Sequence, residues 1–151
     1  MSLDQEVEIL RQIPFFANIE TAKLKLMCFA SERLTFKPGQ TLCREGELGD
    51  AAYIIVDGEA EVSVDTPDGP LAVAVLKRNE IVGEIAILCD VPRIATVTAR
   101  SEVVTLKVTK DLFFQLVMDF PEMGVEIMRV LAHRLEQTMA QLRDARAAAK
   151  G

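Results

Sequence analysis

The sequence predicts a mainly β domain, a small sandwich or barrel with helices before and after it. Three observations predict this class. Apolar residues recur at helical spacing in residues 1–33, short β-rich runs alternate with turn residues over 34–108, and residues 109–151 return to helical spacing. The length of 151 residues and the hydrophobic content of 50% fit one globular domain that covers the chain.

Two helices are expected before the strands. In the first, the apolar residues from Val7 to Ile13 lie close to one face, and Pro14 ends the run. The second is expected over residues 20–31, where apolar side chains again follow at steps of three and four. Asn18 is its expected N-cap, because a short amide side chain can accept a hydrogen bond from a free backbone N–H.

The strands are expected between residues 34 and 108. Residues 53–56 are apolar throughout, as in a strand buried on both faces. Residues 60–65 alternate between apolar and polar side chains, which predicts a strand with one wet face. Turn residues separate these from further β-rich runs, which cover residues 71–76, 95–99 and 103–108.

Two helices are expected at the C-terminal end. Thr109 should cap a helix over residues 111–119, and Pro121 suits the first turn of a long final helix. Apolar and small residues of that helix alternate at steps of three and four, a heptad seam made of Met128, Leu131, Leu135, Thr138, Leu142, Ala145 and Ala149. One interpretation is a helix packed wholly on its own domain. The favoured interpretation is a homodimer through residues 121–149.

Composition excludes several classes of function. The net charge of −6 disfavours nucleic acid and anionic membranes as partners. No apolar run is long enough to cross a membrane and no signal peptide precedes the first helix, so a cytoplasmic protein is expected. We find no nucleophile elbow, P-loop or dinucleotide fingerprint, and the domain is therefore not expected to be an enzyme.

The single histidine and the three cysteines offer little metal or redox chemistry. His133 alone cannot form a multi-histidine metal site, which also argues against a cupin-type enzyme built on a similar roll. The odd set of Cys28, Cys43 and Cys89 gives no disulfide framework, and we interpret these residues as small core hydrophobes. Cys89 lies next to a turn and is the one to test for reactivity. No cofactor and no metal are expected.

Residues 83–97 carry the chemistry. Gly83 permits an unusual backbone conformation, and residues 84–88 can form one short helical turn whose free amides favour an anion such as phosphate. Arg93 follows at the start of a strand, and a guanidinium can meet two phosphate oxygens with parallel hydrogen bonds. Glu84 fits beside an anion if it accepts hydrogen bonds from hydroxyl groups. The alternative is that Glu84 and Arg93 form a structural ion pair across the turn.

This segment resembles the phosphate-binding cassette of the cyclic nucleotide-binding domain family. The family pattern is Gly-Glu-(Leu/Ile)-Ala-Leu, a short spacer, and then (Pro)-Arg-x-Ala-(Thr/Ser)-Val, and residues 83–97 match it with Ile87 in place of the second leucine. The match continues upstream in residues 13–16, 36–39 and 44–58 and covers about residues 13–140. The resemblance implies an eight-stranded jelly-roll β-roll over residues 34–108, with helices over residues 1–33 and 109–151.

The resemblance also implies a ligand and roles for single residues. The ligand would be a cyclic nucleotide, with Arg93 and the amides of Ile85, Ala86 and Ala95 on its phosphate. Gly83 would allow close approach, and Glu84 would accept a hydrogen bond from the ribose 2′-hydroxyl. The final helix often covers the base in this family, and the candidates here are Leu131, Arg134 and Leu135. The expected function is a regulatory sensor that signals through movement of its C-terminal helix.

Two departures from the family pattern matter. Ile94 stands where the family usually has a small residue and where cGMP-selective members often have threonine. Since Ile94 offers no hydrogen bond to guanine, cAMP is expected over cGMP. Ile94 could also crowd the pocket, which leaves as the alternative a ligand-free scaffold for protein contacts. The helix-turn-helix domain of bacterial transcription factors is not present in the 151 residues, so no nucleic-acid contact is expected from this chain alone.

Overall fold

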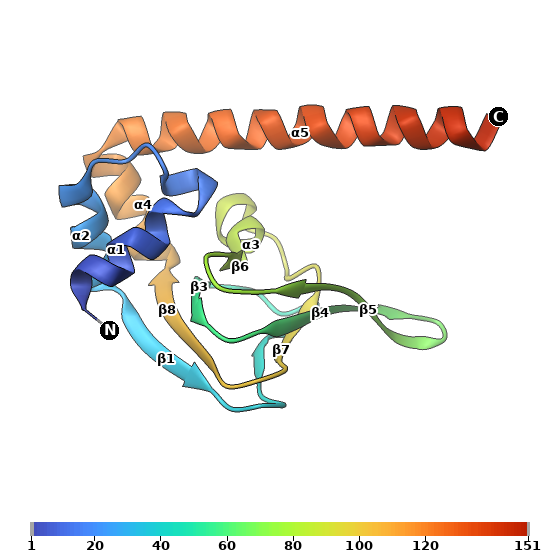
Figure 1. Cartoon of the computed structure of the whole chain (residues 1–151), viewed down its shortest axis with the longest axis horizontal. Helices are drawn as coiled ribbons and strands as arrows, with labels where there is room; N and C mark the ends of the chain where they lie inside the picture. The colour runs from blue at the N-terminus through green and yellow to red at the C-terminus, as the bar shows by residue number, and fades with distance from the viewer. Residues whose placement is uncertain (1, 151) are drawn as a thin grey trace.

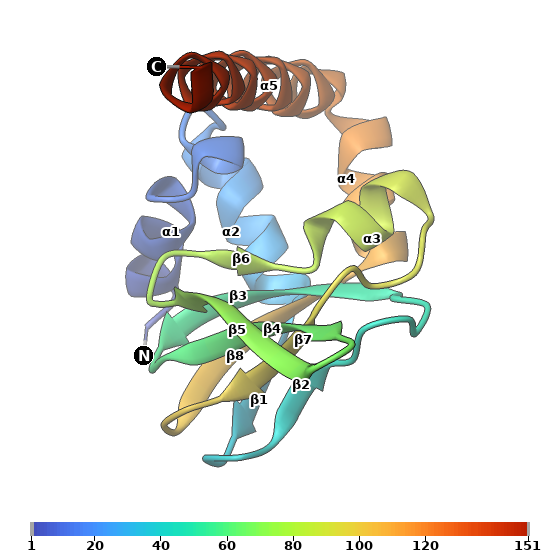
Figure 2. The same ribbon diagram turned by 90° about the vertical axis from the view of Figure 1, so that its right-hand side faces the viewer.

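Eight strands form two four-stranded sheets, which are the walls of a β-roll (Figure 1; Figure 2). The computed structural model describes residues 2–150, without the side chains of Ile85 and Lys150. The sheets have the orders β1-β8-β3-β6 and β2-β7-β4-β5, with antiparallel neighbours throughout. An eight-stranded roll between helices is therefore confirmed. Its strands are β1 (Glu32–Phe36), β2 (Thr41–Cys43), β3 (Ala51–Asp57), β4 (Ala60–Thr66), β5 (Gly69–Leu76), β6 (Ile81–Val82), β7 (Thr96–Ala99) and β8 (Val103–Thr109).

Helices flank the roll at both ends of the chain and interrupt it once. Before the strands come α1 (Leu3–Arg11), the 3-10 helix η1 (Pro14–Phe16) and α2 (Thr21–Ala30). A short helix, α3 (Glu84–Cys89), lies between β6 and β7. After the strands come α4 (Lys110–Asp119) and α5 (Pro121–Lys150). As predicted, Thr109 caps α4, because its hydroxyl accepts a hydrogen bond from the Leu112 N–H.

Strand β3 joins the two hydrophobic clusters of the domain. Ile54 and Val56 belong to the larger cluster, which the helices cover, and Ile55 belongs to the smaller cluster inside the roll. The prediction of a strand buried on both faces is thus confirmed. The alternation predicted for residues 60–65 is weak, since Val62 and Val64 are only half-buried. The reason is that the β4–β5 hairpin projects beyond the rest of the roll (Figure 1).

The predicted cap of the second N-terminal helix is wrong. Glu20 is the N-cap residue of α2, and its side chain makes no capping hydrogen bond. Asn18 lies two residues before Glu20, and its Nδ2 donates a hydrogen bond of 3.3 Å to Oε2 of Glu126 on α5. Lys23 of α2 reaches α5 as well, in an ion pair with Glu122. Asn18 and Lys23 therefore attach the N-terminal helices to the beginning of α5.

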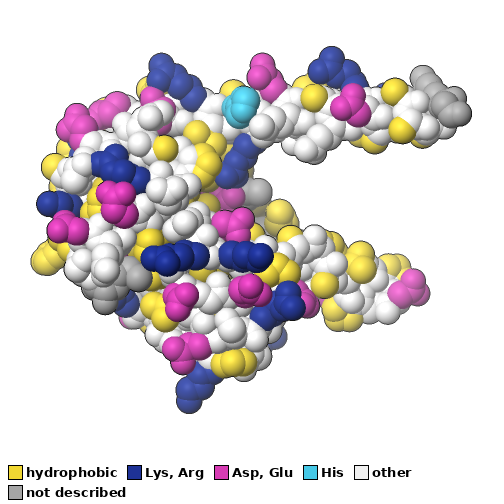
Figure 3. All heavy atoms as spheres, viewed as in Figure 1, with side chains coloured by type: hydrophobic (Ala, Val, Ile, Leu, Met, Phe, Trp, Pro, Cys, Tyr) yellow, Lys and Arg dark blue, Asp and Glu magenta, His cyan; other side chains and the backbone are white. Residues whose placement is uncertain are grey.

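The long helix α5 is packed only over its first turns. Met123 and Ile127 are buried in the larger cluster, whereas the following seam side chains Met128, Leu131 and Leu135 are exposed. Figure 1 shows the C-terminal half of α5 projecting beyond the roll, and Figure 3 shows an open space between it and the β4–β5 hairpin. The interpretation of a helix packed wholly on its own domain is therefore wrong.

Within the described residues, none of the helices combines the length and apolar character that a membrane crossing requires.

Candidate functional site

The turn that begins at Gly83 has the conformation that the sequence predicts. Gly83 has φ 85° and ψ 15°, in the left-handed region that favours glycine, and it is the N-cap residue of α3. Asp90, the C-cap residue of α3, also has a positive φ, of 55°. The carboxylate of Asp90 accepts a hydrogen bond of 2.7 Å from the Lys110 ammonium, which lowers the pKa of Asp90. This contact fastens the end of α3 to the start of α4.

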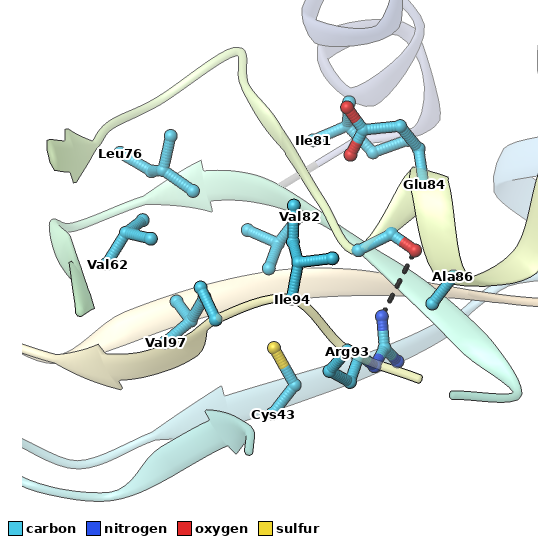
Figure 4. Close-up of a pocket in the computed structure, with 12 residues that line it drawn as sticks. Cys43, Val62, Leu76, Ile81, Val82, Glu84, Ala86, Arg93, Ile94 and Val97 are labelled. Atoms are coloured by element: carbon cyan, nitrogen blue, oxygen red, sulfur yellow. Dashed lines mark hydrogen bonds between the residues drawn. The ribbon is translucent and has the colours of Figure 1, made fainter. Parts of the chain in front are cut away.

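Arg93 is buried beside this turn, with 8% of its surface exposed. Its Nη1 donates a hydrogen bond of 3.1 Å to the Gly83 carbonyl (Figure 4), and its Nη2 donates one of 2.5 Å to the Ala51 carbonyl. The main chain of Arg93 is paired as well, since its N–H donates to the Glu47 carbonyl and its carbonyl accepts from the Gly46 N–H. Hydrogen bonds to the main chain thus hold both the backbone and the guanidinium of Arg93.

An open cavity of about 220 Å³ lies next to Arg93. Most of its wall is apolar, and Arg93 and Glu84 are the charged residues among those described along it. Figure 4 shows Ile94, Val82 and Val97 grouped on the apolar side and the Arg93 guanidinium below α3. The lining residues are Cys43, Val62, Leu76, Ile81, Val82, Gly83, Glu84, Ala86, Arg93, Ile94, Ala95 and Val97. The apolar side of the cavity therefore suits a flat apolar group, and the end at Arg93 suits an anion.

Glu84 does not pair with Arg93, so the alternative of a simple ion pair across the turn is wrong. Its Oε1 instead accepts a hydrogen bond of 3.4 Å from Nη1 of Arg134, which comes from α5. The Arg134 guanidinium also stands over the ring of Phe15, 4.6 Å from its centroid. One side chain of α5 therefore contacts both the pocket wall and the 3-10 helix η1.

The structure brings together most of the predicted site residues. One cavity is lined by six of them, Gly83, Glu84, Ala86, Arg93, Ile94 and Ala95. The backbone of Ile85 lies in the first turn of α3, and its side chain is outside the described atoms. Ile94 is 63% exposed at this cavity, so it narrows the pocket without closing it.

The three predicted base-capping residues are not in the wall of this cavity. Arg134 approaches through Glu84, whereas Leu131 and Leu135 are exposed on α5. A cap by the two leucines would need α5 to move relative to the roll. The final helix is the part of the site for which sequence and structure agree least.

Sequence reasoning missed the far wall of the cavity. Cys43, interpreted as a core residue, is half-buried and lines the pocket, and burial raises the pKa of its thiol although Arg93 lowers it. Cys28 does lie in the core, and burial together with Glu6 raises its pKa to about 11. Val62 and Leu76 face the same cavity from β4 and β5. The one sequence signal for this wall was the alternation of apolar and polar residues along β4, and such alternation does not distinguish a pocket wall from a hydrophobic core.

The remaining candidate for chemistry, His133, is an exposed residue of α5. Within residues 2–150, apart from the side chains left undescribed, the acidic, cysteine and histidine residues form no cluster that could hold a metal ion.

The roll and its arginine-ended pocket are typical of a small-molecule-binding domain. The family model described as "Cyclic nucleotide-binding domain" matches residues 33–120, more than half of the chain. The chain therefore belongs to the cyclic nucleotide-binding domain family, a family of regulatory domains.

Individual relatives agree with this assignment. The CRP-like cAMP-activated global transcriptional regulator of Mycobacterium tuberculosis is 30% identical over 138 residues, which are 91% of this chain and 62% of the relative. A cGMP-dependent protein kinase of Eimeria tenella is 37% identical over 105 residues, which are 70% of this chain and 10% of the kinase. The chain thus spans less than two thirds of either relative.

A solved structure shares the fold over nearly all of its length. The N-terminal domain of a transcriptional regulator from Streptomyces coelicolor A3(2) superposes with a TM-score of 0.78 at 30% sequence identity, and the alignment covers 88% of this chain and 93% of that chain.

Proposed function

We propose that this chain is a cyclic-nucleotide sensor module without catalytic activity, that it binds cAMP in preference to cGMP, and that it transmits binding through α5. The observation that carries the proposal is the buried Arg93, held by two backbone carbonyls at the end of an open apolar cavity. A guanidinium in that position has an anion as its natural partner, and the apolar walls suit a purine ring.

The cyclic phosphate would lie between Arg93 and the first turn of α3. The amides of Ile85 and Ala86 belong to that turn, where backbone N–H groups have no partner within the helix. The amide of Ala95 would approach from the strand side. Because Arg93 keeps further N–H groups beyond those given to the carbonyls, it can meet phosphate oxygens without leaving its place.

The ribose would lie beside Glu84 and donate a hydrogen bond from its 2′-hydroxyl to the Glu84 carboxylate. Replacing Glu84 with alanine should weaken cAMP binding roughly 10- to 100-fold, since a hydroxyl that donates to a carboxylate contributes about 1.5–3 kcal/mol. The affinity for 2′-deoxy-cAMP, which lacks that hydroxyl, should change by less than about twofold. Titration calorimetry with both nucleotides measures the difference, and replacing the exposed Glu102 with alanine is the control. An equal loss for both nucleotides would contradict the assignment.

The preference for cAMP rests on Ile94. The names of the relatives include both nucleotides, so they do not decide between them. Ile94 lines the cavity with a side chain that cannot donate to or accept from guanine, whose extra polar groups would lose water without gaining a partner. Replacing Ile94 with threonine should therefore improve cGMP binding relative to cAMP binding.

Transmission to α5 would begin at the contact between Glu84 and Arg134. A ribose hydroxyl that shares the Glu84 carboxylate changes the partner of Arg134, whose guanidinium also rests on Phe15. Ligand binding would thereby shift the position of α5 between two states. Hydrogen exchange along α5 should change when cAMP is added to the wild type and remain constant when it is added to the Arg93→Ala variant.

We also propose that the exposed seam of α5 pairs two copies of the chain. Met128 and the exposed leucines of this seam follow a heptad pattern, which in water favours a partner helix. The wild type should have twice the chain mass by light scattering, and a double variant with aspartate at Leu135 and Leu142 should be a monomer. Aspartate at the exposed Phe29 of α2 is the control and should leave the dimer intact. A wild-type monomer at tens of micromolar would contradict the pairing.

Thermal unfolding tests the nucleotide assignment. A ligand that binds only the folded state stabilises it by about 2.7 kcal/mol at 100 times its Kd. For a chain of this length this raises Tm by roughly 5–11 °C. We expect such a rise with cAMP, a smaller rise with cGMP at the same concentration, and no rise with inorganic phosphate. A Tm that stays unchanged when either cyclic nucleotide is added at millimolar concentration would contradict the proposal.

A further inference from the structure

Gly49 lies directly against the Arg93 guanidinium. A Cβ atom at this position would overlap Cζ and Nε of Arg93 and would come within 2.7 Å of Nη2. The loop that carries Gly49 is itself fixed to the main chain around Arg93. Leu48 forms a β-bridge with Pro92, and residues 46 and 47 exchange hydrogen bonds with Arg93. Gly49 therefore lies close to the guanidinium because its loop is hydrogen-bonded to the backbone around Arg93.

The backbone at Gly49 does not itself demand glycine. Gly39, Gly46, Gly58 and Gly69 have positive φ angles, and so does Gly83, but Gly49 is outside that group. The φ of Gly49 is therefore not the positive φ that excludes alanine, and the three heavy atoms nearest to the position of a Cβ all belong to the Arg93 guanidinium group. The residue type at position 49 is thus linked to the position of one side chain on another segment.

We propose that Gly49 is a positioning residue for Arg93: the missing side chain leaves the space in which the guanidinium reaches the carbonyls of Ala51 and Gly83 and faces the cavity. This inference rests on the proposed role of Arg93 as the phosphate-binding residue. It adds a determinant of affinity on a loop that is not part of residues 83–97.

The substitution Gly49→Ala separates positioning from folding. The atoms that the new methyl group would meet are the far end of a flexible side chain, which can move while the backbone stays in place. Arg93 would then lose its hydrogen bonds of 3.1 and 2.5 Å to the Gly83 and Ala51 carbonyls. Gly83 also touches the guanidinium, but its positive φ would add backbone strain, so a substitution there has two effects.

The matched control is Gly124→Ala in α5. Gly124 also lacks a positive φ, and a Cβ there meets another side chain, Cγ1 of Val117 at 3.2 Å, away from the cavity. Calorimetric titration should show cAMP affinity at least about tenfold weaker in Gly49→Ala, the effect of one misplaced hydrogen bond to a charged group, and unchanged in Gly124→Ala. The ligand-free Tm of the two variants should be similar.

A double-mutant comparison distinguishes positioning from a general structural role. In the Arg93→Lys background, whose slimmer amine leaves room for a methyl group, Gly49→Ala should change affinity by less than about twofold. The proposal would be overturned if Gly49→Ala lowered the cAMP affinity equally in the wild type and in the Arg93→Lys variant, or lowered it in neither. If Gly49→Ala fails to fold, the double variant should fold. Failure of both would also overturn it.

A measurement without nucleotide keeps this inference separate from the proposed function. In ¹⁵N spectra of the arginine Nε–H groups, the resonance missing from Arg93→Lys identifies Arg93. We expect Gly49→Ala to shift that resonance and Gly124→Ala to leave it in place. A wild type that binds no nucleotide would end the proposed function, and the Arg93 resonance would still show whether Gly49 positions the guanidinium. An unshifted resonance would overturn the positioning role.

Discussion

Replacing Arg93 with alanine is expected to remove measurable nucleotide binding. Truncating one partner of a buried, hydrogen-bonded charge pair costs about 2–5 kcal/mol, which is roughly 30- to several-thousand-fold in Kd. The lost contact should be the one to the phosphate. Arg93 is the positively charged residue along the cavity, whereas Glu84 is negatively charged and would repel a phosphate. Calorimetric titration of wild type and variant with cAMP measures the loss.

The same variant should remain folded. Arg93 is bonded to two backbone carbonyls, and its loss opens the space to a cavity where water can replace those hydrogen bonds. Arg93→Lys is the matched control for charge: it keeps one positive group but loses the planar fork, so binding should fall to an intermediate level. A folded Arg93→Ala protein with wild-type affinity would show that the anion lies elsewhere.

Replacing Phe16 with alanine is expected to have the largest effect on stability. Phe16 is 1% exposed in the larger core cluster, where η1 packs against the helices and the roll. Truncation of a buried phenylalanine costs about 3–5 kcal/mol through lost burial and the cavity that remains. For a chain of this length the loss lowers Tm by roughly 6–20 °C, which thermal unfolding without ligand can measure.

Phe29 supplies the matched control for this prediction. It is also a phenylalanine of the N-terminal helices, but it is 82% exposed. Phe29→Ala should change the free energy of unfolding by less than about 0.5 kcal/mol, as surface substitutions usually do. Similar effects of the two substitutions would contradict the packing of η1 into the core.

Local patterns were sufficient to predict much of this fold. The apolar run of residues 53–56, the cap at Thr109 and the proline at Pro121 each report on their own neighbourhood, and β3, α4 and α5 follow them closely. The short strands β1, β2 and β6 were not predicted individually. Each has five residues or fewer and lies at the edge of its sheet, so its pairing depends on residues distant in the sequence.

The candidate site divides in the same way. The turn at Gly83 and the helix after it are local features, and the sequence predicted both. The partner of Glu84 was not predictable, because Arg134 lies 50 residues away and meets Glu84 only where α5 crosses the roll. Asn18 was misassigned for the same reason: its partner, Glu126, is 108 residues away. Cys43 lines the pocket through its position on β2, which its residue type does not reveal.

The net charge of −6 does not conflict with an anionic ligand. Arg93 acts over a few ångströms inside an apolar cavity, where a charge is screened less than on the surface.

Titration calorimetry of the wild type with cAMP and with cGMP tests the central claim most directly. We expect saturable binding of one nucleotide per chain, tighter for cAMP than for cGMP, and loss of the cAMP binding heat in Arg93→Ala. The absence of binding heat with either nucleotide at millimolar concentration, in protein shown to be folded, would contradict it.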